Sequence, residues 1–216
     1  MNLQALSRID PLRKQAERGS ESARGISPMD PPDAYAPPNT EPVPPEKLHP
    51  FLRRLCEEHA PFTQELGAFE EAIGSIQRNG YTREADAVLR RFFDFFDREF
   101  VPHHRREEAR LFPLLRERLI MAGEHGEGSI VTTAVDVMVD EHAKAMQLAA
   151  VIVNFLGLVF RLADDRSRIM VLDAALEEGK KLIELLRLHI FRENVVVFSL
   201  AHRLILPAEL DEMLHG

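Results

Sequence analysis

Apolar side chains recur every three or four residues along most of the chain after residue 46, and this spacing constrains the fold most strongly. The first run begins at Leu48 and ends at Ile76, with alternating steps of four and three residues. Such steps place side chains on one face of an α-helix. Asn79 and Gly80 follow the run, and a glycine directly after a helical run is a typical C-terminal signal. The sequence therefore predicts one long helix that ends at these two residues.

Three further runs share this spacing, and they cover residues 82–121, 131–159 and 172–200. The second run contains Pro102 and Pro113, and we expect a kink or break near each because proline cannot donate the helical hydrogen bond. Pro207 is expected to end the fourth helix or a short continuation of it. Four long amphipathic helices joined by short loops predict an all-α fold, an up-down-up-down four-helix bundle.

The first part of the chain has a different composition. Nine of the 14 prolines lie between Pro11 and Pro45. Proline fixes its own backbone angle and residues 27–45 have few apolar side chains, so a helix or an inner strand is excluded there. Residues 1–18 could form a short helix. We expect residues 1–46 to be an extended or disordered N-terminal arm and residues 47–216 to be the helical bundle. The arm is either a passive tail or a strap that packs on the bundle or on a partner.

Charge and composition argue against several classes of protein. The 35 acidic and 27 basic residues give a net charge of -8, whereas nucleic-acid binding requires a concentrated basic surface. No uninterrupted apolar run reaches about 18 residues, so no membrane-spanning segment is expected. The N-terminus lacks the apolar stretch of a secretory signal. A single cysteine excludes an intrachain disulfide, and a cytoplasmic location is expected.

Each helical run carries one histidine at a position where the spacing calls for an aliphatic residue. Two of the runs also carry a glutamate four residues later, on the same helix face. The six residues are His59, His103, Glu107, His142, His189 and Glu193. Burying carboxylates in a bundle core is costly unless their charge is neutralised. Four imidazoles and two carboxylates at one level suit a pair of divalent metal ions.

An internal repeat supports this interpretation. The tripeptide that begins at Glu58, EHA, recurs at Glu141, and HHRREEARLFPLL from His103 recurs as HIFRENVVVFSLA from His189. Two helical hairpins, each contributing one histidine and one His-x3-Glu pair, would form a pseudo-symmetric site. The alternative is that all four are core histidines satisfied by hydrogen bonds.

These motifs resemble those of the hemerythrin-like, HHE cation-binding family. The resemblance covers roughly residues 46–205 and rests on CEEH around His59, HHRREEARLFP, DEH around His142 and HIFRENVVVF. It implies a four-helix bundle with a non-heme di-iron centre, in which two iron ions share a bridging oxo or hydroxo. The apolar face of each helical run is called its seam. The resemblance also implies that the six His and Glu residues on these seams are ligands and that Glu107 and Glu193 bridge the metals. Ser199 stands where the family often has proline.

One departure from the oxygen-carrying members affects the expected function. They place a second histidine one turn after the third-helix histidine, where this chain has Met146. Four nitrogens, four carboxylate oxygens and two bridge positions fill ten of twelve octahedral positions, leaving two for small ligands. We therefore expect a protein that handles O2, NO, peroxide or iron, as a sensor, scavenger, iron donor or catalase-like enzyme. The alternative is a structural or interaction bundle with zinc or an empty site.

Several neighbouring residues also carry expectations. His104 is interpreted as a surface residue or as a group that supports a ligand, and Cys56 as a small buried apolar residue. Met146 is expected to line the site. Helix four is apolar on several faces near residues 195–198, so a homodimer or a partner could contact this helix and the N-terminal arm.

Overall fold

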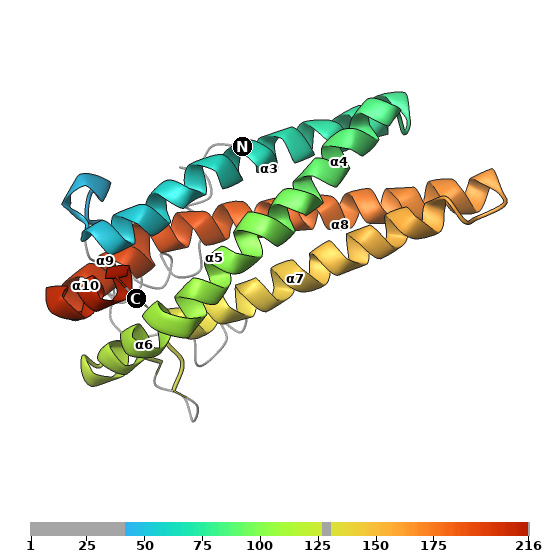
Figure 1. Ribbon diagram of the computed structural model, residues 1–216. Helices are drawn as coiled ribbons and strands as arrows, with labels where there is room; N and C mark the ends of the chain where they lie inside the picture. The colour runs from blue at the N-terminus through green and yellow to red at the C-terminus, as the bar shows by residue number, and fades with distance from the viewer. Residues whose placement is uncertain (1–41, 127–130, 216) are drawn as a thin grey trace, which may run out of the picture. The chain divides into compact units, whose positions relative to one another are not determined.

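The structure is a computed structural model, and it describes residues 42–126 and 131–215. Every regular element in these residues is helical (Figure 1). The α-helices are α3 (Pro50–Asn79), α4 (Arg83–Phe95), α5 (Val101–Arg106), α6 (Phe112–Met121), α7 (Ala134–Val159), α8 (Asp165–Arg192), α9 (Phe198–Leu204) and α10 (Pro207–His215). The all-α prediction is confirmed. Most of the predicted N-terminal arm lies outside the described residues, so its conformation stays a prediction.

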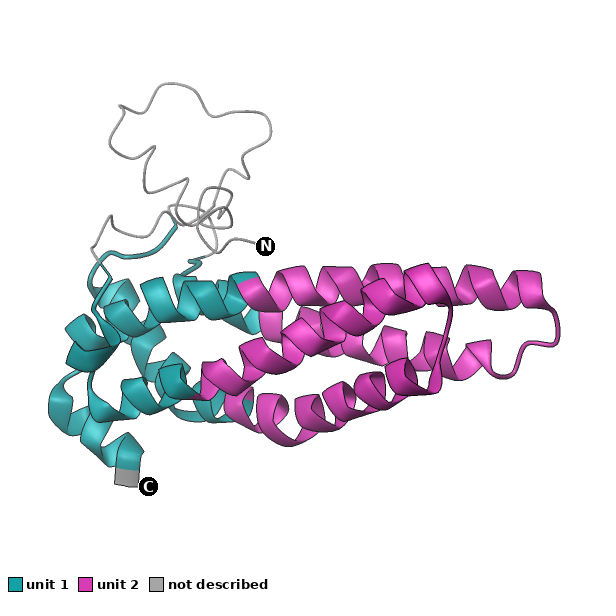
Figure 2. Cartoon of the chain, turned by 90° about the horizontal axis from the view of Figure 1, so that it is seen from above, with its two compact units in different colours: residues 1–57, 105–140, 188–216 teal, residues 58–104, 141–187 magenta. Residues whose placement is uncertain are grey.

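The chain forms two compact units that share helices (Figure 2). Unit 1 contains residues 1–57, 105–140 and 188–216, and unit 2 contains residues 58–104 and 141–187. All four boundaries fall inside helices, namely α3, α5, α7 and α8. Each of the four seam histidines lies two residues from one of these boundaries: His59, His103 and His142 within unit 2, and His189 within unit 1. These histidines are therefore close, along the sequence, to the bounds of the units.

Unit 2 consists of two helical hairpins. In the first, α3 ends at Asn79 and Gly80 adopts a φ of 79°, as the sequence predicts for a glycine C-cap. The hydroxyl of Thr82 then accepts a hydrogen bond from the Ala85 N–H at 3.2 Å and caps the start of α4. In the second hairpin, α7 ends at Val159 and α8 begins at Asp165, after five intervening residues.

Contacts within unit 2 show which helices are neighbours. The rings of Phe69 on α3 and Phe92 on α4 stack with centroids 4.0 Å apart. The guanidinium of Arg187 on α8 donates two hydrogen bonds to Glu70 on α3. Helices α3 and α8 also approach closely at Gly179, where an added Cβ would lie 2.6 Å from the Ile73 side chain. Thus α3 packs between α4 and α8. The up-down-up-down order of the whole chain stays a prediction.

The core of unit 1 joins the start of α3 to α6, α9 and the start of α7. Its largest fully buried side chains include Phe112 and Phe198. The apolar run of helix four is largely covered: Val195 and Val196 are half-buried, and Val197 is buried in this core. The predicted contact of helix four with a partner stays a prediction. Pro207 starts a further helix, α10, which the sequence pattern did not predict.

The long second helix is interrupted twice by a wider π-helical turn. The first turn, η2 (Phe96–Phe100), ends two residues before Pro102, and the second, η3 (Glu107–Leu111), ends two residues before Pro113. A proline clashes with the carbonyl four residues earlier, and the wider turn moves that carbonyl away. The predicted break near each proline is confirmed, and its form is a π turn.

Candidate metal centre

In unit 2, two seam histidines point their Nε2 atoms at one another. His59 on α3 and His103 on α5 are almost fully buried, and their Nε2 atoms are 3.2 Å apart. Two nitrogens that bind one metal at about 2.1 Å and at right angles are about 3.0 Å apart. The observed separation therefore fits two neighbouring ligands of a single metal ion.

A carboxylate fixes the orientation of one of these rings. Nδ1 of His103 lies 2.8 Å from Oε2 of Glu58, so the ring N–H donates to the carboxylate. The proton on Nδ1 leaves the lone pair of Nε2 available for a metal. The Glu58 side chain is about one-quarter exposed, whereas that of His103 is nearly fully buried. Glu58 is thus a positioning residue that the sequence interpretation did not assign.

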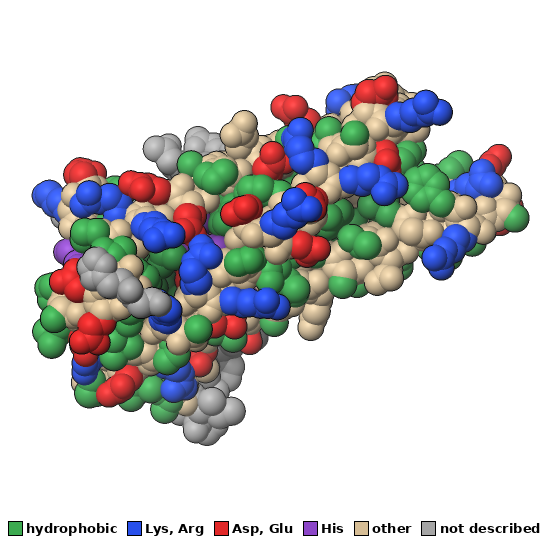
Figure 3. Space-filling model, viewed as in Figure 1, with side chains coloured by type: hydrophobic (Ala, Val, Ile, Leu, Met, Phe, Trp, Pro, Cys, Tyr) green, Lys and Arg blue, Asp and Glu red, His purple; other side chains and the backbone are tan. Residues whose placement is uncertain are grey.

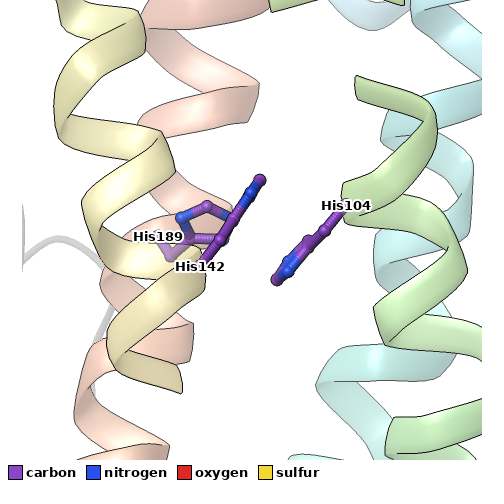
Figure 4. A group of neighbouring side chains, drawn as sticks. All are labelled: His104, His142 and His189. Atoms are coloured by element: carbon purple, nitrogen blue, oxygen red, sulfur yellow. The ribbon is translucent and has the colours of Figure 1, made fainter. Parts of the chain in front are cut away.

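His104 and His142 form a second buried pair in unit 2. Their rings are stacked with centroids 3.5 Å apart and planes 10° from parallel, as Figure 4 shows together with His189 of α8. His104 is only 4% exposed, and Phe100 packs on its ring at 3.9 Å. The interpretation of His104 as a surface residue is wrong, because α5 turns this side chain toward α7. One ring nitrogen of each of these two histidines lies within 4.8 Å of the other.

Unit 1 holds the two glutamates and the fourth histidine. Glu107 and Glu193 have no exposed surface, and their carboxylate oxygens lie within 4.8 Å of one another. Oε1 of Glu193 is 3.3 Å from Nε2 of His189. Burial of His189 opposes its charged form, but the carboxylates of Glu193 and Glu107 outweigh burial and raise the pKa of this imidazole. The local field in unit 1 therefore favours a cation.

Both glutamates occupy the same position in matching π turns. Glu107 begins η3 and Glu193 begins η4 (Glu193–Val197). In each case the N–H five residues later donates to the glutamate carbonyl. The repeat that the sequence shows is therefore a repeat of backbone structure. Wider turns of this kind are frequent at functional sites.

Ser199 shows that proline is not required for this turn. It corresponds to Pro113 in the repeat, and η4 is nevertheless the same kind of π turn as η3. The hydroxyl of Ser199 is buried and accepts a hydrogen bond from the Val43 N–H at 2.9 Å. A proline side chain could not accept this hydrogen bond. Through its hydroxyl, Ser199 links the segment just before α3 to α9.

All six predicted ligands are buried, three in unit 2 and three in unit 1. Their assignment as ligands stays a prediction. Met146 is 43% exposed, so the expectation that it lines the site is wrong. Cys56 is half-buried against the unit 1 core, as expected for a small apolar residue, and burial together with Glu57 and Glu193 raises its pKa.

Comparison with known proteins agrees with this arrangement. A family model described as the hemerythrin HHE cation-binding domain matches residues 50–201. The chain belongs to the hemerythrin HHE cation-binding family. A search among curated proteins and a search among solved structures found no match. The matched region of this hemerythrin-family chain contains all six predicted ligands and the whole of both repeats.

Within this hemerythrin domain, buried His and Glu side chains form groups that could hold a metal ion. The members are His59, His103, His104 and His142 in unit 2, and Glu107, His189 and Glu193 in unit 1. His104 is the member that the sequence interpretation did not assign as a ligand. His104 lies about 100° around the helix from His103. The spacing of apolar residues that points to His103 therefore does not point to His104.

Proposed function

We propose that this protein is a non-heme di-iron protein that handles O2, NO, peroxide or iron. The observation that carries the proposal is the pair Glu107 and Glu193, two fully buried carboxylates at the start of matching π turns. Burial of charge is costly in a helical core. A site that concentrates negative charge beside imidazoles is suited to cations of charge two or higher.

The donor set favours iron over zinc. Structural zinc sites close with four ligands and are commonly rich in cysteine, whereas the one cysteine of this chain packs in the unit 1 core. Carboxylates and imidazoles from helices of a bundle are the ligands of di-iron and di-manganese proteins. The large number of buried donors here, five histidines and two glutamates, exceeds what one tetrahedral ion uses.

His104 is proposed as a fifth nitrogen ligand. Its burial and its stacking on His142 hold the ring inside unit 2. The six residues predicted from the sequence leave two of twelve octahedral positions open, and His104 would fill one of them. A single remaining position would then accept one small molecule such as O2 or NO. This proposal makes reversible binding of such a ligand more plausible than the six-residue set does.

Side chains around the proposed ligands would orient them and limit the access of water to the site. Glu58 holds the Nδ1 proton of His103, so Nε2 can bind a metal. When bound, the iron pair would supply electrons and binding positions for the small ligand. The rings of Phe62 and Phe100 flank His103 and His104, at 5.2 Å and 3.9 Å, and exclude water from this part of unit 2. We also propose that the protein acts in the cytoplasm.

Metal analysis tests the proposal directly. Protein purified from cells grown without added metal should contain about two iron ions per chain and absorb in the near-ultraviolet from ligand-to-metal charge transfer. The double variant Glu107→Ala, Glu193→Ala should lose both the iron and the absorption. Glu108→Ala, Glu184→Ala is the matched control, because both of these glutamates are exposed on the same helical segments. The control should retain both.

Two results would count against the proposal. Zinc, or no metal, in the purified wild type would instead favour a structural or interaction bundle. Full iron content in the double variant would show that the two glutamates are not ligands. Spectra of a His104→Ala variant separate the fifth-ligand proposal from the rest, since only loss of iron affinity or a changed spectrum supports His104.

A further inference from the structure

Helix α7 carries a second apolar seam on its surface. Within unit 2, six exposed residues follow steps of three and four, five in α7 and the last directly after its end: Ala143, Met146, Ala150, Val153, Gly157 and Phe160. Met146 is 43%, Val153 50% and Phe160 62% exposed. Figure 3 shows hydrophobic side chains on the face of the molecule that carries α7. Steps of this kind are typical of a helix that packs against another helix.

Large and small residues alternate strictly along this seam. Met146, Val153 and Phe160 are spaced by seven residues, and so are Ala143, Ala150 and Gly157. In a parallel pair of identical helices, each layer would place large against large or small against small. An antiparallel pair places a large residue against a small one in every layer, which is the interdigitation that close packing requires. The pattern is therefore self-complementary, as a two-fold interface must be.

The packing of the described residues does not require a glycine at position 157. An added Cβ there would meet no described atom within 4 Å, and the φ of Gly157 is not in the left-handed region. A glycine inside a helix destabilises it by roughly 1 kcal/mol relative to alanine. Its position on the seam would let a side chain of a second molecule approach the backbone closely, because glycine has no side chain of its own.

A cavity lies directly beside Gly157. It has a volume of about 340 Å³ and is lined by Leu89 and Phe93 of α4, by residues of α7, and by Tyr81 and Phe160. In the antiparallel register that pairs Ala150 with Val153 of the second copy, Gly157 faces Met146 of the second copy. The methionine would then enter this cavity. Met is flexible and fills irregular apolar space well.

We propose that a second copy of this chain covers the seam, with the two α7 helices antiparallel. Residues 143–160 extend for about 27 Å, too short for helix contact alone to reach the roughly 800 Å² per copy of a standard interface. The cavity beside Gly157 enlarges the contact. The dimer should therefore dissociate in the micromolar range. This inference does not depend on the proposed function.

The composition of α7 also raises the question of a membrane. By length and composition α7 could cross one, and 28% of its most apolar window is buried. The adjoining face of the helix, however, packs in the protein: His142 is stacked on His104, and Ala145 and Ile152 are buried. Extracting these residues would expose the core of unit 2. A self-complementary seam is explained by a second helix and not by lipid.

Sedimentation of the full chain over a range of concentrations tests the interface. Wild type should show a monomer–dimer equilibrium, and Gly157→Leu and Met146→Ser should each weaken association at least tenfold. The matched controls are Gly67→Leu, at a second helical glycine with open space around it, and Met121→Ser, at a methionine that is 61% exposed. The controls should associate as wild type does. Circular dichroism verifies that each variant stays folded.

Cross-linking tests the antiparallel orientation. In a Cys56→Ala background, Ala143→Cys mixed with Phe160→Cys should give the mixed disulfide between copies. Two copies of residue 143 would be about 26 Å apart, given the separation of seventeen residues, and a disulfide needs Cα atoms within about 7 Å. Homodisulfides at each position would overturn the proposal, as would a wild-type chain that is monomeric at about 100 μM. Binding of that monomer to phosphatidylcholine–phosphatidylglycerol vesicles would assign the seam to a membrane surface instead.

Discussion

Neutralising the two buried glutamates should stabilise the metal-free protein and destabilise the metal-loaded one. The perturbation is the double change Glu107→Gln, Glu193→Gln, which keeps the shape of each side chain and removes its charge. Both carboxylates are fully buried, and the desolvation of a buried ion costs several kcal/mol. The contact between Glu193 and His189 at 3.3 Å offsets part of that cost. Because His189 can lose its proton when the carboxylates are gone, we expect a net gain of about 1–3 kcal/mol without metal.

For a chain of this size, 1 kcal/mol shifts Tm by roughly 2–4 °C. The metal-free double variant should thus melt roughly 2–12 °C above the wild type. With iron present the order should reverse. A metal at a hundred times its Kd stabilises the wild type by about 2.7 kcal/mol, and the variant loses most of this contribution because both carboxylates are proposed ligands.

The assay is thermal unfolding at pH 7, followed by calorimetry with a chelator and then with anaerobic iron(II). Glu108→Gln, Glu184→Gln is the control, and both residues are exposed, so each change should stay within about 0.5 kcal/mol of wild type. A metal-free double variant that melts below the wild type would refute the reasoning. It would show that the two carboxylates are structural partners whose interactions outweigh the cost of their burial.

Three further changes test the structural argument by denaturant unfolding. Asp136→Ala should cost about 1–2 kcal/mol at pH 7, because the carboxylate accepts hydrogen bonds from the N–H and hydroxyl of Thr133 at the start of α7. Burial opposes the charged form of Asp136, but Arg116 and Thr133 lower its pKa below the usual value. The stability that the Asp136 carboxylate contributes is present above about pH 4 and is lost as pH falls through the lowered pKa. The free energies of unfolding of wild type and variant should therefore converge in acid. Ser199→Ala should cost about 1 kcal/mol by removing the acceptor of the Val43 N–H, and equal midpoints would contradict that role. Gly80→Ala should cost about 1–2 kcal/mol because its φ is 79°, with Gly67→Ala as the unstrained control.

Local signals predicted the end of the first helix and the proline breaks, but not the start of α8 at Asp165, seven residues before the predicted run. The Asn79–Gly80 stop and the break near each proline are confirmed, because capping and proline sterics act within one or two turns. The form of the break was not predictable, since the pattern of apolar residues does not distinguish a kink from a π turn. Ser199 shows why: the turn after Glu193 persists where the repeat has no proline.

Burial of the site was predictable only in part. The seam positions of the six proposed ligands follow from a spacing of 3.6 residues per turn, and all six are buried. His104 and Met146 were misplaced, because each lies near the edge of its helix face. At such an edge the neighbouring helix decides exposure. Helix α7 covers His104 through His142, whereas Met146 stays 43% exposed.

The sequence by itself determined the all-α fold, the bounds of the first helix and the repeated His and Glu positions, because each depends on periodicity or on neighbours along the chain. Tertiary structure decided which histidines pair, that Glu58 orients His103 at 2.8 Å, and that α7 carries an exposed second seam. The physical reason is that helical spacing specifies which side chains share a face. Which faces are covered depends on the packing of helices that are far apart in the sequence.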